Sequence, residues 1–280
     1  MSEPVRIDEL LSHAAARIGG DSARLDAELL LAHALGHDRA WLLAHADDVL
    51  AADASECIEP LIAARARGVP IAHVLERRGF WTHELEVTPD TLIPRPETEL
   101  LVELALARIA RDRVVYIADL GTGSGAIALA IAAERPLAHV LATDVSKEAL
   151  IVARRNADAL RLRNLEFALG DWCATLAAQH YEVIVSNPPY IAQDDPHLEV
   201  DDLRFEPRLA LVSGIDGLDA IRRIASAASA HLQPGGWLLI EHGWTQGAAV
   251  RELLIAAGLC EVETQRDLEQ RDRVTLGRRG

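Results

Sequence analysis

The chain has 280 residues, which is enough for one large domain and a smaller one. Half of the residues are hydrophobic, but no run of about 18 apolar residues without charge occurs, so we expect no membrane span. The formal net charge of −15 repels a phosphate backbone, so direct nucleic-acid binding is not expected.

Two further features predict where the protein resides. The first ten positions already carry charged residues and lack the apolar stretch of a secretory signal. The cysteines, at positions 57, 173 and 260, lie far apart and in no metal-binding spacing. We therefore expect a cytoplasmic protein with reduced thiols and no metal site.

Residues 1–70 predict a small acidic helical domain. Apolar residues recur at three- and four-residue spacing over 5–18, 23–35 and 54–67. Glycines follow the first two segments, and Gly68 with a nearby proline ends the third. The segment carries 12 acidic and 6 basic residues, which makes it −6 by itself.

Residues 71–95 predict a β-hairpin linker. Short strands are expected over 71–76, 79–83 and 85–88, with a turn at 77–79. The sequence Pro94-Arg95-Pro96 then fixes the backbone at two points, and a helix is expected to follow over 97–109.

Residues 96–280 predict one catalytic domain in which strands and helices alternate. Strands are expected over 114–120, 139–143, 165–169, 181–186, 236–242, 260–264 and 273–277. Helices are expected over 125–133, 147–160, 218–232 and 246–257, and a long loop, acidic and solvated between 194 and 202, over 187–207. This alternation predicts the α/β class: a doubly wound, mostly parallel, seven-stranded sheet with an antiparallel edge.

A glycine-rich loop follows the first strand of this sheet. The strand ends at Asp119-Leu120, and the sequence continues as Gly121-Thr122-Gly123-Ser124-Gly125. Glycines let the backbone turn sharply beside a ligand, and the next helix offers free N–H groups. Asp144 ends the second strand, where its carboxylate can accept hydrogen bonds from both hydroxyls of a ribose. We therefore predict a nucleoside-cofactor site.

Two features favour S-adenosyl-L-methionine over a dinucleotide, although the spacing of Gly121, Gly123 and Ala126 also satisfies the loose dinucleotide pattern. A carboxylate at Asp119 suits a cationic amino-acid group and opposes a pyrophosphate. After the third strand, Asp171-Trp172 offers an acceptor and a stacking face for adenine. A Rossmann-type dehydrogenase remains the alternative from another class, and the motif after the fourth strand disfavours it.

The fourth strand runs into Asn187-Pro188-Pro189-Tyr190. In an open α/β sheet this position lies beside the glycine loop, beyond the carboxyl ends of the strands. An amide or exocyclic amine is a weak nucleophile, so the site must offer acceptors to its NH2 group. The side-chain oxygen of Asn187 and the carbonyl of Pro188 can serve, while the prolines stiffen the turn and Tyr190 can stack on the planar group. These residues predict methyl transfer to a planar nitrogen.

Together these motifs resemble a class I methyltransferase. Three more stretches, at 92–99, 204–207 and 241–244, narrow the resemblance to the HemK/PrmC-type peptide chain release factor glutamine methyltransferases. The match is close over 71–280 and looser over the helical start.

The resemblance implies a substrate and site roles. It implies methylation at N5 of the glutamine in the Gly-Gly-Gln motif of class 1 release factors, with the helical domain contacting the release factor. By motif position, 121–125, Asp144, Trp172 and Asn187 bind cofactor, and 187–190 hold the glutamine amide. Arg95 is expected either at the edge of the substrate site or as a brace of the linker.

Other methyltransferases and a non-catalytic protein share parts of this pattern. A DNA or RNA adenine N6-methyltransferase could use the same loop, with Tyr190 stacking on a flipped base, but the net charge of −15 argues against it. A ribosomal-protein glutamine methyltransferase is a second alternative, which the stretch at 94–99 disfavours. A non-catalytic adaptor would not be expected to keep all the acceptor residues.

Overall fold

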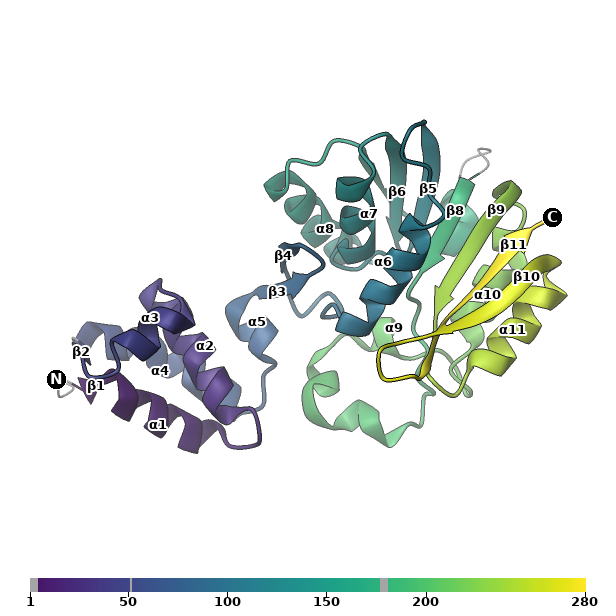
Figure 1. Ribbon diagram of the computed structural model, residues 1–280. Coiled ribbons are helices and arrows are strands. Elements are labelled where there is room, and N and C mark those ends of the chain that lie inside the picture. The colour runs from purple at the N-terminus through teal and green to yellow at the C-terminus, as the bar shows by residue number, and fades with distance from the viewer. Residues whose placement is uncertain (1–4, 51, 177–180) are drawn as a thin grey trace. The chain divides into compact units, whose positions relative to one another are not determined.

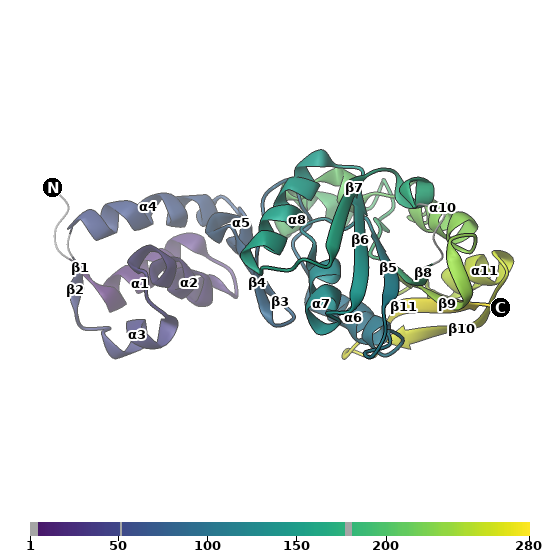
Figure 2. The ribbon, with the colours of Figure 1, turned by 90° about the horizontal axis from the view of Figure 1, so that it is seen from above.

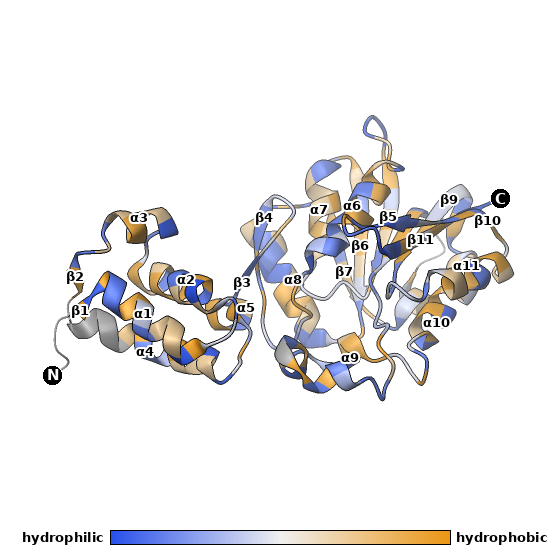
Figure 3. Cartoon of the chain, turned by 60° about the horizontal axis from the view of Figure 1, so that its bottom comes forward, coloured by the Kyte–Doolittle hydropathy of each residue, from blue (hydrophilic) through white to orange (hydrophobic). Residues whose placement is uncertain are grey.

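The computed structural model describes residues 5–50, 52–176 and 181–280. The chain divides into two compact units. Unit 1 runs up to Glu76 and includes the distant segment Glu199–Phe205, and unit 2 comprises Arg77–Leu198 and Glu206–Gly280. Each unit has its own hydrophobic core. In both units the helices carry hydrophobic as well as hydrophilic residues (Figure 3).

Unit 1 is a small helical unit (Figure 1). The buried side chains of Ile7, Leu11, Leu30, Leu31 and Ile58 form the centre of its core, as their helical spacing predicts. Its elements are β1 (Val5–Arg6), α1 (Ile7–Ile18), α2 (Ala23–Leu35), α3 (Arg39–Ala44), β2 (Val49–Leu50), α4 (Ala52–Ala66), α5 (Ile71–Leu75) and the 3-10 helix η4 (Asp201–Phe205).

The expected strand over 71–76 is wrong, because these residues form helix α5. Pro70 starts this helix, and its carbonyl accepts from the N–H groups of His73 and Val74 at 3.0 Å. Glu76 ends the helix in a left-handed conformation, with φ of 55°. The apolar residues of this segment therefore follow a helical period rather than an alternating one.

The β-hairpin exists, but its turn lies further along the chain than expected. Strands β3 (Arg77–Phe80) and β4 (His83–Glu86) pair antiparallel, so 77–79 is strand and not turn. Trp81 makes the turn with φ of 56°, and its N–H donates to Glu99 over 2.9 Å. A tertiary hydrogen bond therefore supports a backbone conformation that a non-glycine residue rarely adopts.

Unit 2 contains the predicted seven-stranded sheet, ordered β10-β11-β9-β8-β5-β6-β7. All neighbours are parallel except those of β11, which is antiparallel to both β9 and β10. The strands are β5 (Val115–Leu120), β6 (Ala138–Asp144), β7 (Leu165–Leu169), β8 (Tyr181–Ser186), β9 (Leu232–Glu241), β10 (Leu259–Arg266) and β11 (Asp272–Arg279). The fold class is thus confirmed.

Helices cover both faces of this sheet (Figure 1, Figure 2). Leu101 and Leu129 pack with Ile117 on one face, and Ile221 and Val250 pack with the other face of β5 and β8. The first layer contains α6 (Glu99–Leu106), α7 (Ala126–Glu134) and α8 (Lys147–Ala159), and the second α10 (Asp219–Ala228) and α11 (Gly247–Ala256). Shorter helices are η1 (Pro96–Thr98), η2 (Trp172–Thr175), η3 (Pro196–Glu199) and α9 (Arg208–Leu211).

Chain order reverses at β5, which places a ligand site there. The chain passes from β5 outward to β6 and β7, then returns to add β8 on the other side of β5. Loops that leave the carboxyl ends of β5 and β8 therefore diverge, and such a switch point is where open α/β sheets bind ligands. No helix of the described residues is long and apolar enough to cross a membrane.

Candidate active site

A cavity of about 610 Å³ opens at this switch point, within unit 2. Its volume falls in the range of sites that hold small molecules and cofactors. The glycine loop after β5, the end of β6, the turn after β7 and the start of the loop after β8 all line it. Pro89, Thr91, Leu92 and Pro94 close one side, and Leu209, Val212 and Ser213 line another.

The glycine loop is tied down at its base. The N–H groups of Gly121 and Thr122 both donate to the carbonyl of Thr143 over 2.9 Å, which joins the loop to β6. Gly121 has φ of 73°, and a Cβ there would lie 3.2 Å from the ring of Trp172. Both the conformation and the close approach therefore require glycine at this position.

Asp144 lies at the end of β6 and lines the cavity. Its Oδ2 accepts from the N–H of Gly123 over 2.9 Å, and its Oδ1 accepts from the N–H of Ser146 over 2.8 Å. Burial raises the pKa of this carboxyl, and the backbone donors oppose that rise. Each oxygen keeps further acceptor capacity, so the geometry fits the predicted ribose contact.

Asp119 lies beneath the loop and is not part of the cavity wall. Its side chain is fully buried, and the hydroxyl of Thr122 donates to its Oδ2 over 2.7 Å. Burial raises the pKa of this carboxyl to about 7, against the lowering effect of Thr122. Direct contact with a cofactor stays a prediction, while the observed role is to brace Thr122, which does line the cavity.

Trp172 and Asp171, which follow β7, also line the cavity. Trp172 begins η2 with φ of 48°, which turns its ring toward Gly121. Asp171 forms an ion pair with Arg223 of α10, and Arg223 also lines the cavity. The indole is placed for stacking on a planar ring, whereas one oxygen of Asp171 is already engaged.

The acceptor loop begins with Asn187, at the end of β8. Its Nδ2 donates to the hydroxyl of Thr98 over 3.2 Å, and its Oδ1 is buried with no hydrogen-bond partner among the described residues. Buried carbonyl oxygens are normally paired. Because Asn187 also lines the cavity, a bound ligand could supply the hydrogen-bond donor that this oxygen lacks. Pro189 lines the cavity as well, whereas Pro188 is buried behind it.

Tyr190 is partly buried and is held through its backbone. The Nε2 of Gln246 donates to the carbonyl of Tyr190 over 3.0 Å, and the Oε1 of Gln246 accepts from Gly243 over 2.9 Å. Burial raises the pKa of the tyrosine hydroxyl, and the charge of Glu241 adds to that rise. The hydroxyl is therefore neutral. Tyr190 does not line the cavity, so its stacking on the substrate amide stays a prediction.

Arg95 lines the cavity between its two prolines. It forms an ion pair with the buried Glu206, which also accepts from the N–H of Ile93 over 3.0 Å. Most of the charge of Arg95 is thus compensated within the protein. Its predicted contact with substrate stays a prediction, and its observed partner is Glu206.

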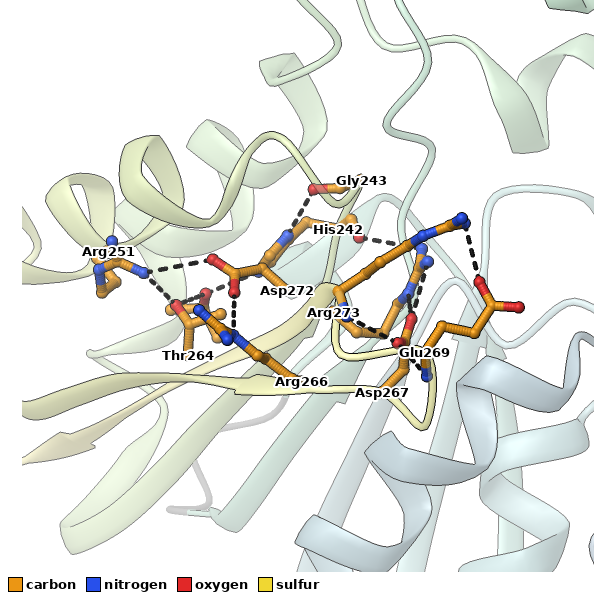
Figure 4. A network of polar contacts seen from close by, with 11 residues as sticks. His242, Gly243, Arg251, Thr264, Arg266, Asp267, Glu269, Asp272 and Arg273 are labelled. Atoms are coloured by element: carbon orange, nitrogen blue, oxygen red, sulfur yellow. Dashed lines mark hydrogen bonds and ion pairs between the residues drawn. The ribbon is translucent and has the colours of Figure 1, made fainter.

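A polar network joins residues that follow β9 to residues of β10 and β11 (Figure 4). Arg273 of β11 donates to Asp267 over 3.2 Å from two nitrogens, and His242 contacts the hydroxyl of Thr275 over 2.8 Å. Burial lowers the pKa of His242, which keeps its ring neutral. This network lies where the end of β9 meets the start of β11, and the charges of Glu241 and Arg273 there act on Tyr190.

Two families match the sequence in separate segments. Residues 9–75 match the PrmC N-terminal domain, and residues 96–203 match the methyltransferase small domain. A release factor glutamine methyltransferase of Xylella fastidiosa (strain Temecula1 / ATCC 700964) is 60% identical over 91% of this chain and 93% of its own. The chain belongs to the release factor glutamine methyltransferase family. Proteins with the same name from Pseudomonas aeruginosa and Escherichia coli K12 are 52% and 47% identical over 91% and 92% of this chain.

Solved structures support the fold. The catalytic domain of hMettl16, solved with the MAT2A 3'UTR hairpin 6, matches with a TM-score of 0.57 and 18% identity over 79% of this chain and 81% of its own. A methyltransferase from Pyrococcus furiosus matches with a TM-score of 0.52 and 19% identity over 70% of this chain and 88% of its own. The expected class I methyltransferase fold, the enzyme class and the cofactor S-adenosyl-L-methionine are confirmed.

Members of this family need a cofactor site, and the residues present fit one. Asp144, Trp172 and the glycine loop surround one cavity, and Asn187, whose Oδ1 is buried without a partner among the described residues, also lines it. Among the described residues, no group of three or more His, Cys, Asp or Glu side chains could hold a metal ion.

Sequence reasoning assigned no role to several residues of this site. Thr98, Glu206 and Glu241 lie in stretches whose only sequence signal is the family resemblance, and no motif includes Gln246 or Arg223. Thr98 follows Pro96 by two positions, and Gln246 follows Gly243 by three. A polar residue so close to a glycine or proline turn is the local signal that could have indicated Thr98 and Gln246, whereas Arg223 lies within α10 and carries no such signal.

Proposed function

We propose that this enzyme transfers a methyl group from S-adenosyl-L-methionine to N5 of the glutamine in the Gly-Gly-Gln motif of class 1 peptide chain release factors. The observation that carries the proposal is the buried, unpaired Oδ1 of Asn187 at the edge of the cofactor cavity. The relatives named above support the acceptor, because each is called a release factor glutamine methyltransferase.

The chemistry asks little of the protein beyond orientation and electrostatics. Bound S-adenosyl-L-methionine supplies a methyl group on a positively charged sulfur. The glutamine NH2 group donates to the Oδ1 of Asn187 and to the carbonyl of Pro188, and these two hydrogen bonds orient the nitrogen lone pair and stabilise the positive charge that develops on the nitrogen. The nitrogen–carbon bond forms as the sulfur–carbon bond breaks, and the methylated nitrogen then releases one proton to water, so no strong general base is required. Tyr190 covers the planar amide, and the prolines add no competing N–H donor.

The helical segment 1–70 is proposed to contact the release factor. It matches the PrmC N-terminal domain, and its sequence carries 12 acidic against 6 basic residues. An acidic surface attracts a basic partner surface and raises the rate of encounter at low salt. We place the enzyme in the cytoplasm, where its proposed acceptor would take part in translation.

The test offers labelled S-adenosyl-L-methionine to the enzyme with each of three acceptors: a class 1 release factor, a ribosomal protein and DNA. Label is expected in the release factor only, and fragmentation is expected to map it to the Gly-Gly-Gln glutamine. A release factor with Ala in place of that glutamine is the matched control and should take up none. Label in the ribosomal protein or the DNA, with an unlabelled release factor, would refute the proposal.

A further inference from the structure

Glu241 is a buried carboxyl directly behind the acceptor loop. It ends β9, and Ile240 before it pairs with Ser186 at the end of β8, so Glu241 and Asn187 leave neighbouring strands at the same level. The residue is 1% exposed. Neither carboxyl oxygen receives a hydrogen bond of ordinary length and angle from a described residue.

The groups around Glu241 belong to the acceptor site. Burial raises the pKa of its carboxyl to about 7, while the hydroxyl of Thr98, the charge of Arg273 and the amide of Asn187 lower it. Glu97 opposes them with its own negative charge. Arg273 is itself shared, because it donates to Asp267 and to the carbonyl of His242. Thr98 and Asn187 are therefore the neutral donors that Glu241 faces.

The hydrogen bond between Asn187 and Thr98 indicates which groups donate and which accept around Glu241. Thr98 accepts from the Nδ2 of Asn187, so its own single hydrogen is free to point to another acceptor. The carboxyl of Glu241 is an acceptor on that side. A carboxylate behind the amide attracts its NH2 end and repels its carbonyl end, so the amide settles with Oδ1 away from Glu241.

We propose that Glu241 is a positioning residue: through Thr98 it holds the Asn187 amide with Oδ1 directed at the acceptor nitrogen. This inference rests on the proposed function of Asn187 as NH2 acceptor. An Asn187 amide rotated by half a turn would present its own NH2 group to the glutamine NH2 group, and two donors do not pair. A buried carboxylate costs stability that a hydrophobic side chain of similar volume would not, so packing alone does not account for it.

The test compares Glu241→Gln with wild type. The variant keeps the shape and removes the charge, so Asn187 is no longer biased toward one orientation. We expect kcat for release factor methylation to fall about 10- to 100-fold. KM for the acceptor and Kd for S-adenosyl-L-methionine should change less than about twofold, and Tm should stay or rise. Glu182→Gln, which changes a buried glutamate at the opposite end of β8, is the matched control and should keep wild-type kcat.

The relay through Thr98 makes a second expectation. Thr98→Val should lower kcat as Glu241→Gln does, and Thr98→Ser should recover most of that loss because it restores the hydroxyl. The double variant should lose little more than the worse single variant, since both changes break one chain of contacts. Losses that multiply would contradict a shared path.

A spectroscopic readout separates this inference from the proposed function. The side-chain NH2 resonances of Asn187, identified by their loss in Asn187→Ala, should shift across neutral pH in wild type and stay constant in Glu241→Gln. Groups facing Glu241 are Thr98, Asn187, Tyr190, Arg273 and Glu97. The inference would be overturned if the Asn187 NH2 resonances of the wild type stayed constant with pH, or if Glu241→Gln left kcat unchanged. Failure of the proposed function appears separately, as wild-type enzyme that leaves the release factor unlabelled.

Discussion

Gln246 donates through Nε2 to the backbone carbonyl of Tyr190 over 3.0 Å, and this contact joins the start of α11 to the acceptor loop. The loop around Gly217 presses on the same carbonyl, since a Cβ on Gly217 would lie 2.3 Å from it. The last residue of the acceptor motif is thus held by a hydrogen bond and by close packing.

Gln246→Ala removes that hydrogen bond and leaves the Tyr190 carbonyl unpaired. We expect kcat for release factor methylation to fall about tenfold, which corresponds to roughly 1.4 kcal/mol, with unchanged affinity for S-adenosyl-L-methionine. Steady-state kinetics and calorimetry check the two parts. Gln265→Ala, on the edge strand β10, is the control; an equal loss there would show that the effect is not specific to Tyr190.

Asn187→Ala removes the proposed NH2 acceptor. Loss of one preorganised hydrogen-bonding group at a reacting centre costs about 10²- to 10³-fold in rate, so we expect methyl transfer to fall by that amount. Cofactor affinity should fall only a few-fold, because the glycine loop, Asp144 and Trp172 remain. Single-turnover kinetics with saturating cofactor measure the first quantity, and near-normal turnover would exclude the assigned role.

Asp144→Asn keeps the side-chain shape and removes the charge at the predicted ribose contact. Hydrogen bonds to charged groups contribute about 1.5–3 kcal/mol, so we expect affinity for S-adenosyl-L-methionine to fall about 10- to 100-fold. Isothermal titration calorimetry measures it directly. Asp158→Asn is the control, because Asp158 is an exposed residue of α8 and lines no part of the cavity. Unchanged affinity in Asp144→Asn would remove Asp144 from the cofactor site.

Asp119→Asn should make stability less sensitive to pH. The pKa of Asp119 is raised from 3.8 to about 7 in the folded protein, so between these values the folded state binds the extra proton and stability falls as pH rises. The variant lacks this proton and keeps an oxygen for Thr122. Its Tm relative to wild type should therefore be higher at pH 8 than at pH 5, as measured by thermal unfolding at both values. A difference that is constant with pH would mean that Asp119 stays charged throughout.

Removal of residues 1–70 tests the proposed role of the helical segment. Unit 2 keeps its own two hydrophobic clusters, so cofactor affinity should be preserved. The value of kcat/KM should fall for an intact release factor and stay the same for a short peptide with the Gly-Gly-Gln motif. Circular dichroism and calorimetry establish that the remainder is folded. Equal loss with both acceptors would assign the effect to the catalytic unit instead.

The sequence was sufficient to predict the sheet and the loops at its switch point. Strand alternation predicts a doubly wound parallel sheet whose loops meet at one edge, and in the structure Gly121 and Asn187 follow the neighbouring strands β5 and β8. The α/β class, the seven strands and the antiparallel edge follow from the same pattern. Boundaries were less accurate where a proline stood next to an apolar run, as at 71–75.

Side-chain partners could not be predicted, because they join residues with no spacing relationship. Thr98 and Asn187 are separated by 89 positions and meet only after η1 and β8 are in place. Asp119 illustrates the same limit. Its position before the glycine loop predicts a cofactor ligand, whereas in the structure its side chain lies below the loop and accepts a hydrogen bond from Thr122. Neighbourhood in the sheet can be read from sequence, but the depth of a side chain depends on all the elements that cover it.

The order of the last two strands affects how the site is completed during synthesis. Strand β10 leaves the ribosome before β11, yet β11 lies between it and β9. The edge strand must therefore wait for residues 272–279, and until they emerge, β9 exposes one side to other chains. Arg273, which faces Glu241 and Tyr190, arrives on that same strand. A nascent enzyme can thus form its cofactor loop early, while the half that receives the acceptor is assembled last.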